Sequence, residues 1–113
     1  MNAMNVKTRK AAEKVLKAVL ARYPEARDES VSELDRPTIL DYDGTVVVSW
    51  ESGPYEWAYR FTMGGTDWEV YHLATAAGVE PEAAREMATE EPVIIPGVYA
   101  EPYYSFSLGV YPE

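Results

Sequence analysis

Residues 5–23 carry a regular helical pattern. Apolar side chains recur at three- and four-residue steps, which places them on one face of a helix. They are Ala12, Val15, Leu16, Val19 and Tyr23. Lysines recur at the same spacing on another face, at Lys7, Lys10, Lys14 and Lys17. Pro24 cannot continue the helix because it lacks an amide hydrogen. The pattern predicts an N-terminal helix with a basic stripe, followed by an acidic loop over 25–37.

Residues 38–51 have the pattern of a β-hairpin. Thr38–Tyr42 and Thr45–Glu51 are rich in β-branched and aromatic residues, and only Asp43 and Gly44 separate them. Asp-Gly favours the type I′ turn, in which both central residues need a positive φ. Alternate residues from Val46 to Trp50 can then be buried on one side of the second strand.

Residues 54–63 are open to two interpretations. Large apolar residues alternate with polar or small ones, as in a strand; they are Tyr55, Trp57, Tyr59, Phe61 and Met63. Gly53-Pro54 and Gly64 are instead typical of the start and end of a helix. Because the alternation is the longer signal, we predict a strand, with a helix as the alternative.

Two short helices are expected next. Thr66–Glu69 has the spacing of a capping box, which predicts a helix over 67–77 that ends at Gly78. Pro81 suits the first turn of another helix, over 81–90.

The remaining residues, 93–111, return to β character. Val93–Ile95 and Val98–Ala100 are short pieces between prolines. Tyr103–Tyr111 is predicted as one longer strand, with Tyr104, Phe106, Leu108 and Val110 on one side.

Together these elements predict a small single α+β domain over residues 1–113. The Asp-Gly hairpin makes the sheet mainly antiparallel, with a basic N-terminal helix and two short acidic helices. The chain has 113 residues, of which 47% are hydrophobic and 26% charged, as is ordinary for one globular domain. It has no apolar run of about 18 residues, so no membrane span is expected.

The residue types present limit the chemistry. The absence of cysteine excludes disulfides and thiolate metal sites, and it fits a cytoplasmic location. His72 is the single histidine, so one chain cannot build a zinc site from several imidazoles. We expect neither a metal nor a cofactor.

Charge is unevenly distributed within the net −9. Residues 1–27 carry seven basic and two acidic groups, whereas residues 28–113 carry three basic and seventeen acidic groups. Phosphate contact relies on Lys and Arg, so the acidic body is not expected to bind DNA directly. The acidity serves solubility in one interpretation. In the other interpretation the acidic surface binds a basic protein partner. One form of this hypothesis is that the surface imitates the charge of nucleic acid.

Two groups of residues are candidates for partner binding. Most large aromatic residues of a small domain fill its core, but Tyr99, Tyr103 and Tyr111 fall opposite or outside the apolar register of the last strand. Aromatic residues are enriched in binding patches. The second predicted acidic helix contributes Glu80, Glu82 and Glu86.

The segment Ile39–Val46 resembles the first motif of haloacid dehalogenase-type phosphohydrolases, an apolar strand that ends in Asp-x-Asp-Gly-Thr. The resemblance implies that Asp41 is a nucleophile, that Asp43 is the acid/base and that both help to hold Mg²⁺. Elsewhere the chain departs from the family: no lysine follows Lys17, and no later Gly-Asp or Asp-Asp pair completes a metal site. The alternative is that Asp43-Gly44 is simply a hairpin turn.

A second resemblance covers more of the chain. Trp50–Ala58, Gly97–Tyr103 and Leu108–Pro112 look like segments of small uncharacterised proteins from actinobacteria and their phages. The resemblance implies no particular activity, and it favours a phage or host accessory protein that acts by binding.

The function predicted from the sequence is a non-catalytic, acidic protein-binding module. Two alternatives stay open. One is a Mg²⁺-dependent phosphohydrolase that uses Asp41 and Asp43, and the other is a structural protein that forms a homo-oligomer.

Overall fold

A computed structural model describes residues 5–27 and 35–113. Its elements, in chain order, are α1 (Val6–Arg22), the 3-10 helix η1 (Pro24–Arg27), β1 (Thr38–Tyr42), β2 (Thr45–Ser49), α2 (Trp57–Met63), β3 (Gly65–Thr66), α3 (Trp68–Ala76), α4 (Pro81–Ala88), β4 (Thr89–Glu90), β5 (Val98–Tyr104) and β6 (Ser107–Pro112). The predicted α+β class with a mainly antiparallel sheet is confirmed.

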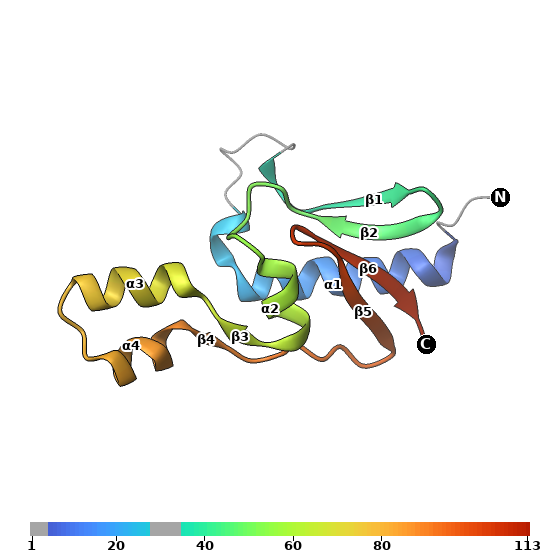
Figure 1. The fold of residues 1–113 in the computed structure, drawn as a ribbon. Coiled ribbons are helices and arrows are strands. Elements are labelled where there is room, and N and C mark those ends of the chain that lie inside the picture. The colour runs from blue at the N-terminus through green and yellow to red at the C-terminus, as the bar shows by residue number, and fades with distance from the viewer. Residues whose placement is uncertain (1–4, 28–34) are drawn as a thin grey trace.

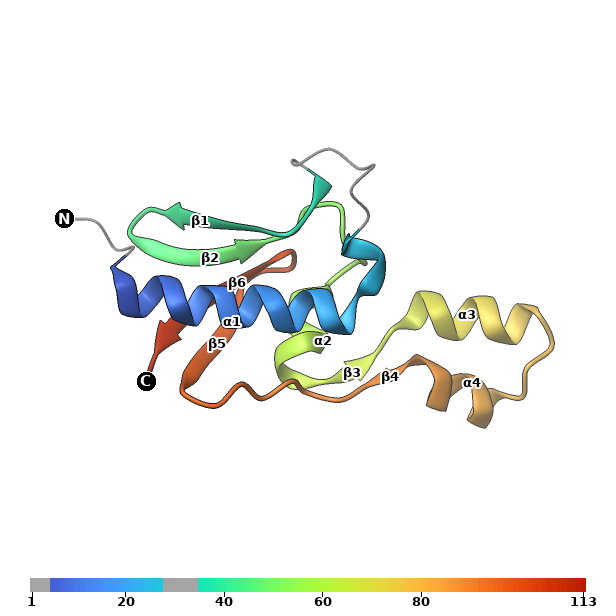
Figure 2. The ribbon, with the colours of Figure 1, turned by 180° about the vertical axis from the view of Figure 1, so that it is seen from behind.

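Four strands form the main sheet in the order β1-β2-β6-β5, and every neighbouring pair is antiparallel. Helix α1 crosses one face of this sheet (Figures 1 and 2). Its inward side chains pack on alternate residues of the strands. The core so formed includes Val15 and Val19 of α1, Val46 and Val48 of β2, and Leu108 and Val110 of β6.

Helix α1 forms where the periodic pattern predicts it. The side chain of Asn5 caps its first turn by accepting a hydrogen bond from the Thr8 amide at 2.8 Å. Ala12, Val15 and Val19 are fully buried, as expected, and the lysine stripe is solvent-exposed. The helix ends at Arg22, immediately before Tyr23 and Pro24.

The β1–β2 hairpin turns as predicted. Asp43 and Gly44 have φ values of 51° and 85°, which is the left-handed backbone that a type I′ turn requires. Oδ1 of Asp41 accepts a hydrogen bond from the Gly44 amide at 3.1 Å and so stabilises the turn.

The predicted strand over 54–63 is wrong, because Trp57–Met63 is helix α2. The buried residues Trp57 and Phe61 are four apart and lie on one face of that helix, while Tyr59 and Met63 point to solvent. The alternation along the sequence therefore concealed a helical pattern. Gly64, with φ of 75°, ends α2 as the alternative interpretation expected.

The predicted single strand Tyr103–Tyr111 is also wrong, because the chain reverses at Ser105 and Phe106 to form the β5–β6 hairpin. Leu108 and Val110 enter the core, but Tyr104 and Phe106 do not share their side of the sheet. Val93–Ile95 forms no strand, whereas Val98–Ala100 is the first part of β5.

Helices α3 and α4 form an arm, residues 65–90, that projects from the body on the short β3–β4 ribbon (Figure 1). Asp67 rather than Thr66 caps α3, through its contacts with the Glu69 and Val70 amides. The helices pack on each other through small side chains, since Ala74, Ala84 and Ala88 are the buried residues of the pair. The arm gives the molecule its elongated shape of 54 × 31 × 21 Å.

An aromatic cluster fills the core where α1, β2 and α2 meet. The Tyr23 and Trp50 ring centroids are 5.5 Å apart, those of Trp50 and Trp57 are 5.9 Å apart, and Phe61 adjoins Trp57 at 6.2 Å. The indole of Trp57 donates to the Trp50 carbonyl at 3.0 Å, which satisfies its only polar atom.

Candidate functional site

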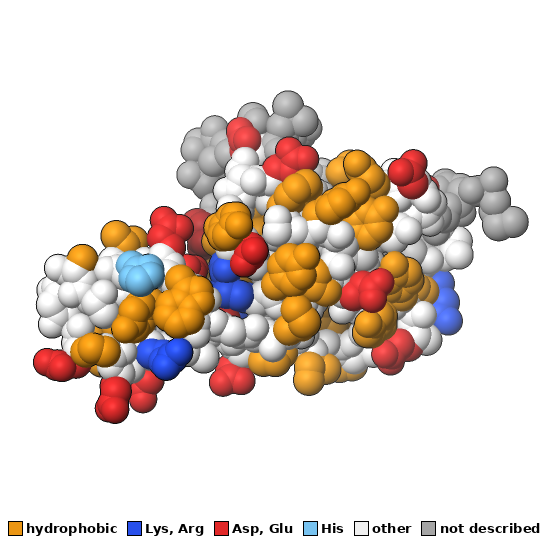
Figure 3. All heavy atoms as spheres, viewed as in Figure 1, with side chains coloured by type: hydrophobic (Ala, Val, Ile, Leu, Met, Phe, Trp, Pro, Cys, Tyr) orange, Lys and Arg blue, Asp and Glu red, His pale blue; other side chains and the backbone are white. Residues whose placement is uncertain are grey.

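The face of the main sheet that is turned away from α1 is covered by none of the described helices (Figures 1 and 2). Hydrophobic side chains gather on it, with acidic ones among them (Figure 3). We call this surface the tyrosine face and define it by Tyr42, Tyr99, Glu101, Tyr103, Tyr104, Phe106 and Tyr111. Strand register explains most of the grouping, because alternate residues of neighbouring strands stand on the same side of a sheet. A register shift between Pro102 and Tyr104 interrupts the alternation in β5, and both Tyr103 and Tyr104 line the cavity on this face.

One half of the tyrosine face is built around Glu101. The hydroxyl of Tyr99 donates to Oε2 of Glu101 at 3.2 Å, and the ring of Tyr111 lies 6.0 Å from that of Tyr99. Hydrogen bonding to Glu101, together with its negative charge, raises the pKa of Tyr99. Burial raises the pKa of Tyr111, and the charge of Glu101 adds to the effect. Glu101 is therefore a carboxylate that interacts with two neighbouring tyrosines.

Gly109 allows Tyr111 to lie against the sheet. A Cβ at position 109 would meet the Tyr111 hydroxyl at 3.2 Å and its Cε2 at 3.3 Å. Because glycine has no Cβ, the ring can occupy the space that a side chain at position 109 would fill. The pair resembles the packing by which aromatic residues cover glycines in designed sheets.

The other half of the tyrosine face is a cluster of edge-to-face rings. Tyr42 lies 5.8 Å from Tyr103 and 6.0 Å from Tyr104, and Tyr103 lies 4.9 Å from Tyr104. Phe106 stacks on Tyr104 at 5.7 Å. The rings surround a shallow cavity of about 70 Å³, floored by Val47 and by Ser49 and Ser107, whose hydroxyls are 3.0 Å apart. Preformed ring contacts of this kind leave little side-chain freedom to be lost on binding.

The charge of the tyrosine face is negative. Glu101 lies within it and Glu51 borders the cavity. Asp41 and Asp43 are exposed at the adjoining hairpin tip. Among the described residues, the register places no Lys or Arg on this side of the sheet. The surface thus combines aromatic rings with uncompensated carboxylates.

The structure divides the two predicted groups of binding residues between separate surfaces. Tyr99, Tyr103 and Tyr111 all belong to the tyrosine face, and Tyr99 is 52% exposed. Glu80, Glu82 and Glu86 lie on the arm, at the start of α4 and along its exposed side. Sequence reasoning missed Tyr42, Tyr104, Phe106 and Glu101. Their common position follows from the pairing of β1, β2, β6 and β5, which only the fold reveals.

The arm exposes apolar side chains of its own. Trp68 is 51% exposed and Leu73 is 66% exposed, and Met87 is also exposed. The guanidinium carbon of Arg85 lies 5.6 Å from the centre of the Trp68 ring, a cation–π contact between the two helices. His72 packs beside Tyr71 at 5.3 Å between ring centroids.

A network of charged groups joins the arm to the body. Arg60 of α2 is buried, and it pairs with Glu90 of β4 and with Asp67, the latter at 3.5 Å. Oε1 of Glu90 also accepts from the Tyr23 hydroxyl at 3.0 Å and lies 3.5 Å from Arg22. Arg22 donates in addition to the Glu91 carbonyl at 2.7 Å. The network links both strands of the ribbon to α1 and α2, so it sets how the arm leaves the body.

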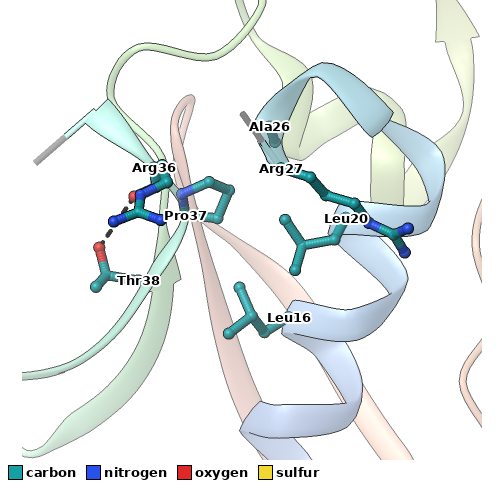
Figure 4. Close-up of a pocket in the computed structure, with 7 residues that line it drawn as sticks. All are labelled: Leu16, Leu20, Ala26, Arg27, Arg36, Pro37 and Thr38. Atoms are coloured by element: carbon teal, nitrogen blue, oxygen red, sulfur yellow. Dashed lines mark hydrogen bonds between the residues drawn. The ribbon is translucent and has the colours of Figure 1, made fainter. Parts of the chain in front are cut away.

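A hollow of about 680 Å³ lies between α1 and the edge strand β1. Leu16 and Leu20 point into it from the helix, and Pro37 lies on the opposite wall (Figure 4). Ala26 and Arg27 border it at the end of η1. It is mainly apolar and lies on the helix side of the sheet, so it is separate from the tyrosine face.

Asp41 and Asp43 occupy the tip of an antiparallel hairpin, both exposed. Asp41 binds the turn amide, and Asp43 holds a positive φ in that turn. Over residues 5–27 and 35–113, no group of three or more His, Asp or Glu side chains is placed to hold a metal ion. The sheet that carries Asp41 is antiparallel at every described strand pair.

Comparisons with family models, with curated proteins and with solved structures found no match. The interpretation of the site therefore rests on its own residues. Within the described ranges, no helix is both long enough and apolar enough to cross a membrane.

Proposed function

We propose that this protein is a non-catalytic protein-binding module and that the tyrosine face is its contact surface. One observation carries the proposal: one face of the sheet presents two groups of aromatic rings, each in mutual contact, and no described helix covers it. Tyrosines contribute large contact areas with few rotatable bonds, and they are enriched at protein interfaces. Exposed aromatic groups of this extent are unusual on a monomer that has no partner.

The negative charge favours a basic protein over a nucleic acid. Protein surfaces that bind nucleic acid neutralise phosphates with Lys and Arg, and the described strands place neither on this face. Rings and carboxylates together suit a partner whose surface carries arginine or lysine.

Affinity capture with paired variants tests the proposal. The tagged protein is compared with a Tyr99→Ser/Tyr104→Ser double variant and with a Tyr55→Ser/Tyr59→Ser control. Tyr55 and Tyr59 are exposed tyrosines outside the sheet, so both pairs remove the same groups. A captured protein that is lost from the first variant and kept by the control supports the proposal. Equal capture by all three proteins, or no capture, contradicts it.

Self-association is a second candidate function, and the exposed Trp68, Leu73 and Met87 of the arm favour it. Sedimentation at micromolar concentration distinguishes a homo-oligomer from a monomer. A monomeric mass would count against a structural, self-assembling role and would leave the proposal for the tyrosine face unaffected.

A further inference from the structure

We infer that the tyrosine face recognises an extended basic segment of its partner, with arginines at alternate positions. This inference rests on the proposed function and adds the chemistry of the ligand. It is carried by the interaction of Glu101 with Tyr99 and Tyr111, by the spacing of side chains along β5, and by the absence of basic groups from the described part of the face.

The first step concerns the charge of Glu101. Its carboxylate accepts a hydrogen bond from Tyr99, and no described Lys or Arg pairs with it. A carboxylate has about four lone-pair directions, so its contacts with the two phenols leave part of its capacity unused. Guanidinium satisfies two of these at once, in a planar bidentate pair.

The second step concerns the two neighbouring rings. Tyr99 and Tyr111 are 52% and 37% exposed and interact with the same carboxylate. A guanidinium that pairs with Glu101 therefore lies beside two phenol rings, and arginine stacks on aromatic rings better than lysine does. Aromatic rings next to a carboxylate favour a cation over a neutral or acidic group.

The third step concerns spacing. Tyr99 and Glu101 are alternate residues of β5 and stand on one side of the sheet, about 7 Å apart in a regular strand. A register shift between Pro102 and Tyr104 then brings Tyr104, which pairs with Ser107, to the same side. An extended peptide that lies along β5 presents its own alternate side chains at the same interval. One arginine then reaches Glu101, and the next lies at the ring cluster of Tyr42, Tyr103 and Tyr104, close to the carboxylates of the hairpin tip.

Titration with synthetic peptides tests the inference, with binding followed by fluorescence anisotropy. The probes are a short peptide in which arginine alternates with threonine, the same peptide with lysine in place of arginine, and the same peptide with glutamate. We expect the arginine peptide to bind several-fold more tightly than the lysine peptide, because guanidinium both stacks and pairs bidentately. The glutamate peptide should not bind, and affinity for the arginine peptide should fall as salt rises.

Matched variants locate the binding. Glu101→Gln keeps the shape of the side chain and removes its charge, and we expect affinity for the arginine peptide to fall roughly tenfold. Tyr99→Ala should weaken binding about threefold through loss of the ring. Glu69→Gln makes the same charge change at an exposed position of α3 on the arm and should leave the affinity unchanged.

Three results would overturn the inference: equal affinity for the arginine and lysine peptides, binding of the glutamate peptide, or equal weakening by Glu101→Gln and Glu69→Gln. The last would mean that overall acidity, and not the tyrosine face, attracts the peptide. If no peptide binds while capture of a protein still depends on Tyr99 and Tyr104, the ligand assignment fails and the proposed function stands.

Discussion

The hydroxyl of Tyr99 donates a hydrogen bond to Oε2 of Glu101, 3.2 Å away and two residues further along β5. The bond holds a carboxylate and a phenol together on an exposed sheet face, with the ring of Tyr111 beside them. It makes the tyrosine face an electrostatic as well as an aromatic surface.

Removing the charge of Glu101 should change the titration of its neighbours. The carboxylate raises the pKa of Tyr99 because it disfavours a phenolate next to it. Glu101→Gln should therefore lower the pKa of Tyr99 toward the ordinary value of about 10. Titration of ¹³C-labelled tyrosine by NMR measures this directly. An unchanged pKa for Tyr99 would show that the two groups do not interact in solution.

Breaking the network at the base of the arm should loosen the arm before the body. Arg60→Met leaves Glu90 largely buried without its closest partner, a loss that typically costs about 3 kcal/mol or more. Few other contacts hold the arm, whose buried residues include only small alanines. Amide hydrogen exchange should accelerate in α3 and α4 well before it does in β2 and β6. Arg85→Met is the control, since Arg85 is exposed and its ring contact is with Trp68 of the arm. Amide exchange that accelerates equally in the arm and the body of the Arg60 variant would contradict this account.

Tyr23 should make stability fall at alkaline pH. Burial raises the pKa of Tyr23, and the negative charge of Glu90 adds to it, against the opposing charges of Arg60 and Arg22. A group whose pKa is higher in the folded state than in the unfolded state stabilises the fold. This stabilisation is fully present below the unfolded-state pKa of about 10 and is lost as the pH rises toward the pKa of the folded state. In urea unfolding, the free energy of unfolding of the wild type should therefore fall as the pH rises above about 10, and it should fall less steeply in Tyr23→Phe. The same slope in both proteins would contradict the assignment.

Asp41 should behave as a turn residue. Asp41→Ala removes the acceptor for the Gly44 amide and should lower the free energy of unfolding by about 1 kcal/mol, whereas Asp41→Asn keeps an oxygen in place and should change it little. Urea unfolding of the two variants measures the difference. The phosphohydrolase alternative predicts instead a Mg²⁺-dependent hydrolysis of phosphate esters that Asp41→Asn abolishes. Observing that activity would contradict the turn assignment.

Local signals in the sequence were enough for much of the fold. Asp43-Gly44 fixed a two-residue hairpin, Pro24 ended α1, and the Thr66–Glu69 spacing with Pro81 marked the helices of the arm, although the cap is Asp67. The two wrong predictions of secondary structure arose where a sequence fits both the two-residue period of a strand and the helical period, or where a turn lacks its usual residues. Trp57 and Phe61 fit both an alternating and a four-residue pattern, and only their burial in the aromatic cluster decides between them. Ser105-Phe106 contains neither Gly nor Asn, so the β5–β6 reversal left no signal.

The tyrosine face could be predicted only in part for the same reason. Tyr99, Tyr103 and Tyr111 stood out because they fall outside the apolar register. Tyr42 joins them through the pairing of β1 with β2 and of β2 with β6, segments far apart in the chain, which the sequence pattern does not specify. Tyr104 joins them through the register shift between Pro102 and Tyr104 in β5.

The central claim, that the tyrosine face binds a separate protein, is tested most directly by site-specific photo-crosslinking. The photoreactive residue p-benzoylphenylalanine is introduced in place of Tyr104 on the face and, in a second protein, in place of Tyr55 outside it. We predict that position 104 crosslinks a distinct protein in lysate of the source organism and that position 55 does not. Equal crosslinking from the two positions, or none from position 104, would contradict the account.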